Sequence, residues 1–129
     1  MTAGHTGRMR LLYVEDNRIN AVLFEEALRR YEWIELRIAE DGSDAERVAA
    51  NWTPDVLVLD SHLPDTSGVQ LLPRLRALPG LSGLPAFMCS ADALPNEVAR
   101  ALASGFDGYW TKPIDFDLVV ADLKRVSGR

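Results

Sequence analysis

The sequence predicts a single α/β domain in which a five-stranded, mostly parallel sheet is covered by helices on both faces. Short apolar runs alternate with longer segments of helical periodicity along the whole chain. Two of the runs, LLYV and VLVL, are apolar at every position, and no repeat or linker divides the 129 residues. Fully apolar runs are typical of parallel strands buried on both faces, and regular alternation of strands and helices implies right-handed crossovers.

The first half of the chain contains three predicted strands and two helices. Both helices carry apolar residues at spacings of three and four, and the sequence IELRIA alternates as a strand with one wetter face, which favours a position near the sheet edge. A turn at Asp41-Gly42 precedes the second helix, and Pro54 closes the connection after it. In chain order the elements are strand 11–14, helix 19–27, strand 34–39, helix 45–52 and strand 56–59.

The second half of the chain continues the alternation. Ser67-x-x-Gln70 is the pattern of a capping box at the start of a helix, and Pro73 within that helix should distort it. Pro95 suits a first helical turn, and Gly105 suits a helix end. The predicted elements are helix 67–78, strand 86–90, helix 95–105, strand 108–111 and helix 116–126.

Composition narrows the class of protein. A net charge of −5 argues against nucleic acid as a partner, because phosphate binding requires a basic face. The single cysteine, Cys89, has no partner for an internal disulfide and lies in the apolar run AFMC, where it is expected to pack as a small buried residue. The sequence shows no secretory signal and no apolar run of the length that spans a membrane, so we expect a cytoplasmic protein.

Specific polar side chains follow four of the five predicted strands. Each one taken alone is equally compatible with a solvated loop or a turn. Because the carboxyl ends of parallel strands meet at one edge of the sheet, where ligands bind in folds of this class, we expect these side chains to gather there. They are Glu15 and Asp16 after the first strand, Asp60 after the third, Ser90 at the end of the fourth, and Thr111 and Lys112 at the end of the fifth.

Three of these groups are carboxyls from two strands that we expect to be neighbours. Two carboxylates about 5 Å apart repel by roughly 3 kcal/mol at an effective dielectric constant near 20, so the cluster must bind a proton, a cation or a positive side chain. Lys112 supplies one positive charge, and it stands out because all but two of the 14 basic residues are arginine. Mg²⁺ prefers oxygen ligands and phosphate oxygens, which indicates a site for a phosphoryl group.

These pieces occur in order in one known family. YVEDN contains Glu15 and Asp16, VLVLD ends at Asp60, CSA contains Ser90, and GYWTKPI contains Tyr109 and Lys112. The spacing is 44 residues from Asp16 to Asp60, 30 from Asp60 to Ser90 and 22 from Ser90 to Lys112. From about residue 10 to 126 the chain resembles the receiver domain of two-component response regulators, and most closely the receivers of hybrid sensor histidine kinases. The resemblance implies a flavodoxin-like, doubly wound (βα)5 fold with strand order 2-1-3-4-5, a flexible tail at 1–9, the receiver domain at 10–126 and a short tail at 127–129.

The resemblance also implies roles for the residues at the strand ends. Asp60 would be the phosphoacceptor, taking a phosphoryl group from a histidine kinase or a histidine phosphotransfer protein. The Mg²⁺ ligands would be Glu15, Asp16, Asp60 and the backbone carbonyl of His62. Ser90 and Lys112 would bind the phosphoryl oxygens, Tyr109 would be the aromatic switch, and the Lys112-Pro113 bond would be cis.

The implied function is signalling rather than enzymatic turnover. Such a protein catalyses only its own phosphorylation and dephosphorylation, and phosphorylation changes the face made by the fourth helix, the fifth strand and the fifth helix. A downstream protein, or kinase domains fused to the receiver, would read that face. The chain contains no kinase core and no output domain, so we expect a stand-alone or an excised receiver.

Two other functions are compatible with part of this pattern, and the chain departs from the family pattern at two positions. A phosphohydrolase with an aspartyl nucleophile would carry Asp-x-Asp at the strand end, whereas this chain has His62 at the second position. A degenerate receiver could act as an interaction module without phosphorylation.

Glu15 replaces the commoner aspartate and should keep the charge. Trp110 stands where a smaller aliphatic residue is usual, and we expect it to be a core anchor beneath the site.

Overall fold

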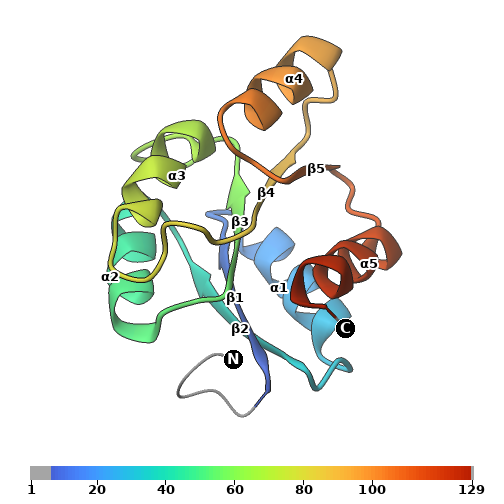
Figure 1. The fold of residues 1–129 in the computed structure, drawn as a ribbon. Coiled ribbons are helices and arrows are strands. Elements are labelled where there is room, and N and C mark those ends of the chain that lie inside the picture. The colour runs from blue at the N-terminus through green and yellow to red at the C-terminus, as the bar shows by residue number, and fades with distance from the viewer. Residues whose placement is uncertain (1–6, 129) are drawn as a thin grey trace.

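The computed structural model describes residues 7–128, which form five parallel strands alternating with five helices (Figure 1). The strand order is β2-β1-β3-β4-β5, which confirms the predicted doubly wound fold and places β2 at an edge. None of the helices in this range is long and apolar enough to span a membrane. The elements are β1 (Met9–Val14), α1 (Arg18–Leu28), β2 (Ile34–Ala39), α2 (Gly42–Trp52), β3 (Val56–Asp60), α3 (Gly68–Arg76), β4 (Ala86–Ser90), α4 (Pro95–Ala103), β5 (Gly108–Thr111) and α5 (Phe116–Ser127).

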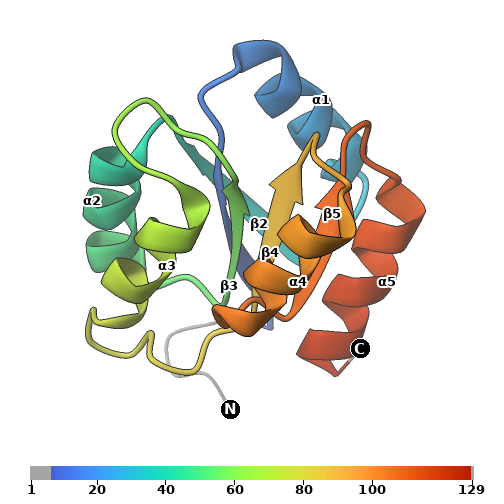
Figure 2. The same cartoon turned by 90° about the horizontal axis from the view of Figure 1, so that it is seen from above.

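The helices form two layers around the sheet. Helices α1 and α5 cover one face, and α2, α3 and α4 cover the other (Figures 1 and 2). Along β1, Leu11 and Tyr13 face the first layer, while Leu12 and Val14 face the second. Since successive side chains of a strand point to opposite faces, a strand between two helical layers must be apolar at every position. This is why LLYV and VLVL show no alternation.

Helix starts are set mainly by capping side chains. Ser67 accepts a hydrogen bond from the backbone N–H of Gln70 at 3.2 Å, which confirms half of the predicted capping box. The Gln70 side chain contacts the Thr66 hydroxyl instead of returning to Ser67. Three further helices have a side-chain cap that pattern analysis did not identify, provided by Asn17 at α1, Asp41 at α2 and Asp115 at α5.

Element boundaries differ from the predicted ones by a few residues. Strand β1 begins at Met9, which pairs with Ile34 of β2, because the ladder extends two residues beyond the apolar run. Helix α3 contains Pro73 and ends at Arg76, two residues before the predicted end, and α5 continues to Ser127. Residues 1–6, most of the predicted tail, and residue 129 lie outside the described part of the chain.

The first residue of α3, Gly68, lies against the end of β3. A Cβ atom at this position would be 2.6 Å from the backbone oxygen of Asp60 and 3.1 Å from the Met88 side chain. The Gly68 N–H also donates to the carbonyl of Ser61 at 3.1 Å. Glycine is therefore required for the close approach of the helix to the loop that follows Asp60.

We expect Gly68→Ala to lower the free energy of unfolding by about 1–3 kcal/mol, because the added methyl group overpacks a rigid backbone contact. Urea denaturation followed by circular dichroism measures the change. Gly83→Ala is the matched control, since a Cβ there meets no atom within 4 Å. If the two variants were equally stable, the proposed contact would not constrain the loop.

Candidate functional site

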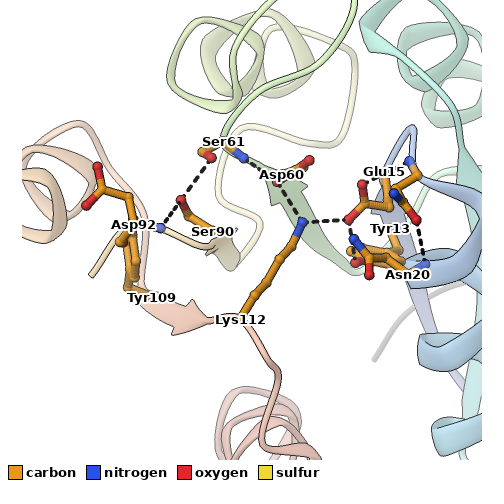
Figure 3. A network of polar contacts seen from close by, with 10 residues as sticks. Tyr13, Glu15, Asn20, Asp60, Ser61, Ser90, Asp92, Tyr109 and Lys112 are labelled. Atoms are coloured by element: carbon orange, nitrogen blue, oxygen red, sulfur yellow. Dashed lines mark hydrogen bonds and ion pairs between the residues drawn. The ribbon is translucent and has the colours of Figure 1, made fainter. Parts of the chain in front are cut away.

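The parallel register brings the polar strand ends to one edge of the sheet. Strands β1 and β3 are neighbours although β2 lies between them in sequence, so strand order reverses at β1. Ligand sites of doubly wound sheets lie beside such a reversal. Figure 3 shows the side chains that meet there, which are Glu15 after β1, Asp60 of β3, Ser90 of β4 and Lys112 after β5.

Three carboxyl groups form an acidic cluster at this edge. Glu15, Asp16 and Asp60 each offer an oxygen, and these atoms all lie within 4.8 Å of one another. Glu15 and Asp60 are only 2% and 6% exposed, whereas Asp16 is exposed to solvent. Buried carboxylates so close together need a positive charge, and hard oxygen donors are the ligands that Mg²⁺ prefers. The acidic residues therefore fit a magnesium ion.

The ammonium of Lys112 bridges the two buried acids. Its Nζ lies 2.9 Å from Glu15 Oε1 and 3.2 Å from Asp60 Oδ1 (Figure 3). Burial would lower the pKa of Lys112, but its contacts with the two carboxylates outweigh burial and raise the pKa above its ordinary value. The two carboxylates therefore favour the charged form of Lys112.

Glu15 is held by three donors. Its Oε1 accepts from Lys112 and from the Tyr13 hydroxyl at 3.0 Å, and its Oε2 accepts from the backbone N–H of Asn17 at 3.1 Å. Burial alone would raise the pKa of Glu15, but the hydrogen bonds from Lys112 and Asn17 lower it below its ordinary value. Burial raises the pKa of Tyr13, so its phenol stays protonated and remains a donor.

Asp60 is the less stabilised of the two buried carboxylates. Its Oδ1 accepts from the Ser61 N–H at 2.9 Å and from Lys112, and neither of these donors contacts Oδ2. Burial first and then the charge of Glu15 raise the pKa of Asp60 to about 6, against the opposing effect of Lys112. The group is still ionised at neutral pH, but less completely than an ordinary aspartate.

A chain of hydroxyls and backbone groups connects the acidic cluster to β5. Ser61 donates its hydroxyl to Ser90 Oγ at 2.9 Å, and Ser90 Oγ also accepts from the backbone N–H of Asp92 at 3.1 Å. The carbonyl of Asp92 accepts from the Tyr109 hydroxyl at 2.6 Å (Figure 3). Ser90 and Tyr109, predicted as phosphoryl ligand and switch, are thus joined through one residue of the β4–α4 loop.

The structure also places four features that the sequence singled out, which are His62, Trp110, the Lys112-Pro113 bond and Cys89. His62 is exposed on the loop after β3, and its imidazole is not part of the acidic cluster found among residues 7–128. Trp110 is 2% exposed and stacks on Phe87 with ring centroids 4.6 Å apart, which confirms it as a core anchor. The Lys112-Pro113 peptide bond is cis, as the resemblance implied. Cys89 is buried, and burial raises the pKa of its thiol to about 12.

Sequence patterns missed several polar contacts of the site. Tyr13 belongs to an apolar run, but it lies two residues before Glu15, so the two side chains point to the same face and the hydroxyl can reach the carboxylate. Ser61 follows Asp60 directly, and the only signal for it was a hydroxyl beside the strand end. The contributions of Asn17 and Asp92 come from the backbone, which residue identity does not encode.

Comparison with known proteins identifies relatives of the whole fold. The family model for the response regulator receiver domain matches residues 11–124. The chain is 39% identical over 120 residues to the probable transcriptional regulatory protein TcrX of Mycobacterium tuberculosis, covering 92% of this chain and 50% of that protein. It is 34% identical over 122 residues to the sensor histidine kinase RcsC of Salmonella typhimurium, covering 95% of this chain and 13% of the kinase. The chain thus spans half the length of the first relative and a small part of the second.

One solved structure with the same fold contains a magnesium ion. The receiver domain of sensor histidine kinase PA1611 from Pseudomonas aeruginosa was crystallised with a magnesium ion coordinated in its active site cleft. It is 27% identical to this chain, with a TM-score of 0.84 over 95% of this chain and 99% of that one.

In the magnesium-free protein we expect the Asp60 carboxyl to titrate near pH 6, which side-chain ¹³C NMR can follow and Asp60→Asn can assign. As pH falls through this value, Asp60 becomes neutral and the cluster loses a charge. Lys112→Met should move the midpoint upward, because the ammonium lowers the pKa of Asp60. A midpoint close to 4, or a downward movement in Lys112→Met, would contradict the electrostatics described above.

Proposed function

Because the chain belongs to the response regulator receiver family, we propose that it accepts a phosphoryl group on Asp60 and thereby switches the face formed by α4, β5 and α5. The observation that carries this proposal is the pairing of a buried, incompletely stabilised carboxylate with a bridging ammonium. A structural aspartate would be fully satisfied by its neighbours. Asp60 instead shares its cation with Glu15 and keeps a raised pKa.

The proposed chemistry is transfer from a phosphohistidine. An oxygen of Asp60 attacks phosphorus, the P–N bond of the donor breaks, and the product is an acyl phosphate on Asp60 and a free imidazole that takes a proton from solvent. Ionised Asp60 is the nucleophile, and a pKa near 6 leaves it ionised at cytosolic pH. The chain turns over no external substrate in this scheme, and the receiver family as a whole works in signalling.

The acidic cluster is the proposed place of Mg²⁺. Glu15, Asp16, Asp60 and the backbone carbonyl of His62 would hold the ion, and when bound it would neutralise negative charge on the acids and on the phosphoryl oxygens. Lys112 is proposed to contact a phosphoryl oxygen, because its ammonium already contacts Asp60 at the end of a flexible side chain. The Ser90 hydroxyl would donate to another of these oxygens.

The proposed phosphodonor is a histidine kinase or a histidine phosphotransfer protein. The relatives support this class of donor because one of them is itself a sensor histidine kinase that contains a matching segment. The reader of the phosphorylated state would be a downstream protein or kinase domains in the same polypeptide. The net charge of −5 continues to disfavour direct contact with nucleic acid.

Labelling by a small phosphodonor tests the acceptor and the metal site together. With acetyl phosphate and increasing Mg²⁺, we expect the wild type to form one phosphorylated species on a phosphate-affinity gel and Asp60→Asn to form none. Asp16→Asn should require at least about ten times more Mg²⁺, because it removes the charge of a proposed direct ligand. If wild type and Asp60→Asn behave alike, the domain is an interaction module that works without phosphorylation.

The proposed switch uses the link between Ser90 and Tyr109. Donation by Ser90 to a phosphoryl oxygen would pull its hydroxyl away from the Asp92 N–H, which now lies at 3.1 Å. The Asp92 carbonyl would then move and weaken its bond to the Tyr109 hydroxyl. Tyr109, which is half-buried, could turn towards the space beside β4 and change the surface next to α4.

Beryllofluoride, a stable phosphoryl mimic, tests this relay without phosphotransfer. In backbone NMR with Mg²⁺ we expect changes at Asp60, Ser90 and Asp92 that extend to Tyr109 and α4, because the ligand shifts an existing equilibrium between two states. Tyr109→Phe is the matched control, since it keeps the ring and removes the bond to Asp92. Changes confined to the acidic cluster in the wild type would leave Asp60 as acceptor and refute the relay.

A further inference from the structure

Tyr13 fixes a hydroxyl group beneath the acidic cluster. Its side chain is fully buried, and its ring stacks on Phe24 of α1 with centroids 4.0 Å apart. Phe24 in turn contacts Phe116 of α5 edge-on at 5.8 Å. The ring is thus packed against α1, where Phe24 connects it to α5, and its hydroxyl reaches Glu15 Oε1 at 3.0 Å (Figure 3).

One of the donors to Glu15, Lys112, is shared with Asp60. It contacts Asp60 as well, so any movement towards a group on Asp60 draws it away from Glu15. The Glu15 side chain is 1% exposed, and water cannot easily replace a lost donor there. A buried carboxylate that loses a hydrogen bond carries the desolvation cost of the unpaired oxygen.

We propose that Tyr13 is a positioning residue that keeps Glu15 Oε1 hydrogen-bonded and oriented while Lys112 moves between Glu15 and the group bound at Asp60. This inference rests on the proposed function, because that function supplies the reason for Lys112 to move. The contacts that support it are those of the site without metal. Tyr13 and Asn17 together hold both oxygens of Glu15, one each, without help from Lys112. The ammonium is therefore free to leave at lower cost.

The same contact accounts for glutamate rather than aspartate at position 15. Tyr13 lies two residues back on the same face of β1, and its hydroxyl meets the far end of the longer side chain. An aspartate is shorter by one methylene group and would hold its carboxylate out of reach of a phenol at 3.0 Å. Tyr13 and Glu15 thus form a matched pair, which gives a direct test.

Magnesium titration of four proteins, followed by calorimetry without phosphodonor, tests the pair. Without the Tyr13 hydroxyl, Lys112 is the only side-chain donor to Oε1 among residues 7–128 and competes more strongly with Mg²⁺ for the acids. We expect Tyr13→Phe to weaken Mg²⁺ binding about three- to tenfold in the Glu15 protein and by less than about 1.5-fold in Glu15→Asp. Equal effects in both backgrounds would mean that the Tyr13 hydroxyl does not act through the Glu15 carboxylate, and would overturn the proposal.

Unfolding in urea at pH 8 without Mg²⁺ tests the inference independently of the proposed function. In Lys112→Met the phenol is the last side-chain donor to Oε1, so Tyr13→Phe should lower the folding equilibrium constant about fivefold more there than in the wild type. Additive effects overturn the inference even if Asp60 is phosphorylated normally. If the wild type binds no Mg²⁺, the proposed metal site is wrong, and the unfolding measurements on Tyr13→Phe in the two backgrounds still decide the role of Tyr13. If Lys112→Met does not fold, the magnesium titration decides.

Discussion

Two carboxylates are buried at the ends of adjacent strands, and the ammonium of Lys112 is what makes their proximity tolerable. Glu15 and Asp60 would repel by several kcal/mol at this separation without a cation between them. Lys112 follows β5, which lies two places from β3 and three from β1 in the sheet, so the order and register of β1, β3, β4 and β5 must all be correct for the bridge to form. The electrostatics of the site therefore depend on the whole fold.

The loop after β3 is fixed in position by contacts from outside the site. Asp65 accepts hydrogen bonds from the backbone N–H groups of Gly42 and Ser43, at 2.8 and 3.0 Å, at the start of α2. These bonds lower the pKa of Asp65. Gly68 closes the other end of the loop against the carbonyl of Asp60. Both ends of the segment that carries Ser61 and His62 are thus fixed by neighbouring elements.

The fold was predictable because its signals are local and repeated. Apolar runs and helical spacing depend only on the residues themselves, and the strand-end rule then located Glu15, Asp60 and Lys112 without knowledge of distances. Tyr13 and Asp65 were not assigned roles, because each acts through a contact that exists only after the chain has folded. An apolar strand explains the ring of Tyr13 completely, so nothing in the pattern directed attention to its hydroxyl.

The raised pKa of Asp60 means that its ionisation lowers the free energy of unfolding. An ordinary aspartate in the unfolded chain ionises near pH 4, whereas Asp60 in the fold does so near 6. Its protonated form therefore favours the folded state below pH 4, and this contribution, roughly 3 kcal/mol, is lost as pH rises through 6. Glu15 acts in the opposite sense, since its lowered pKa stabilises the fold at neutral pH and that contribution is lost on acidification. At neutral pH the electrostatic cost of the site is concentrated on Asp60, and a cation bound at the acidic cluster would lower it.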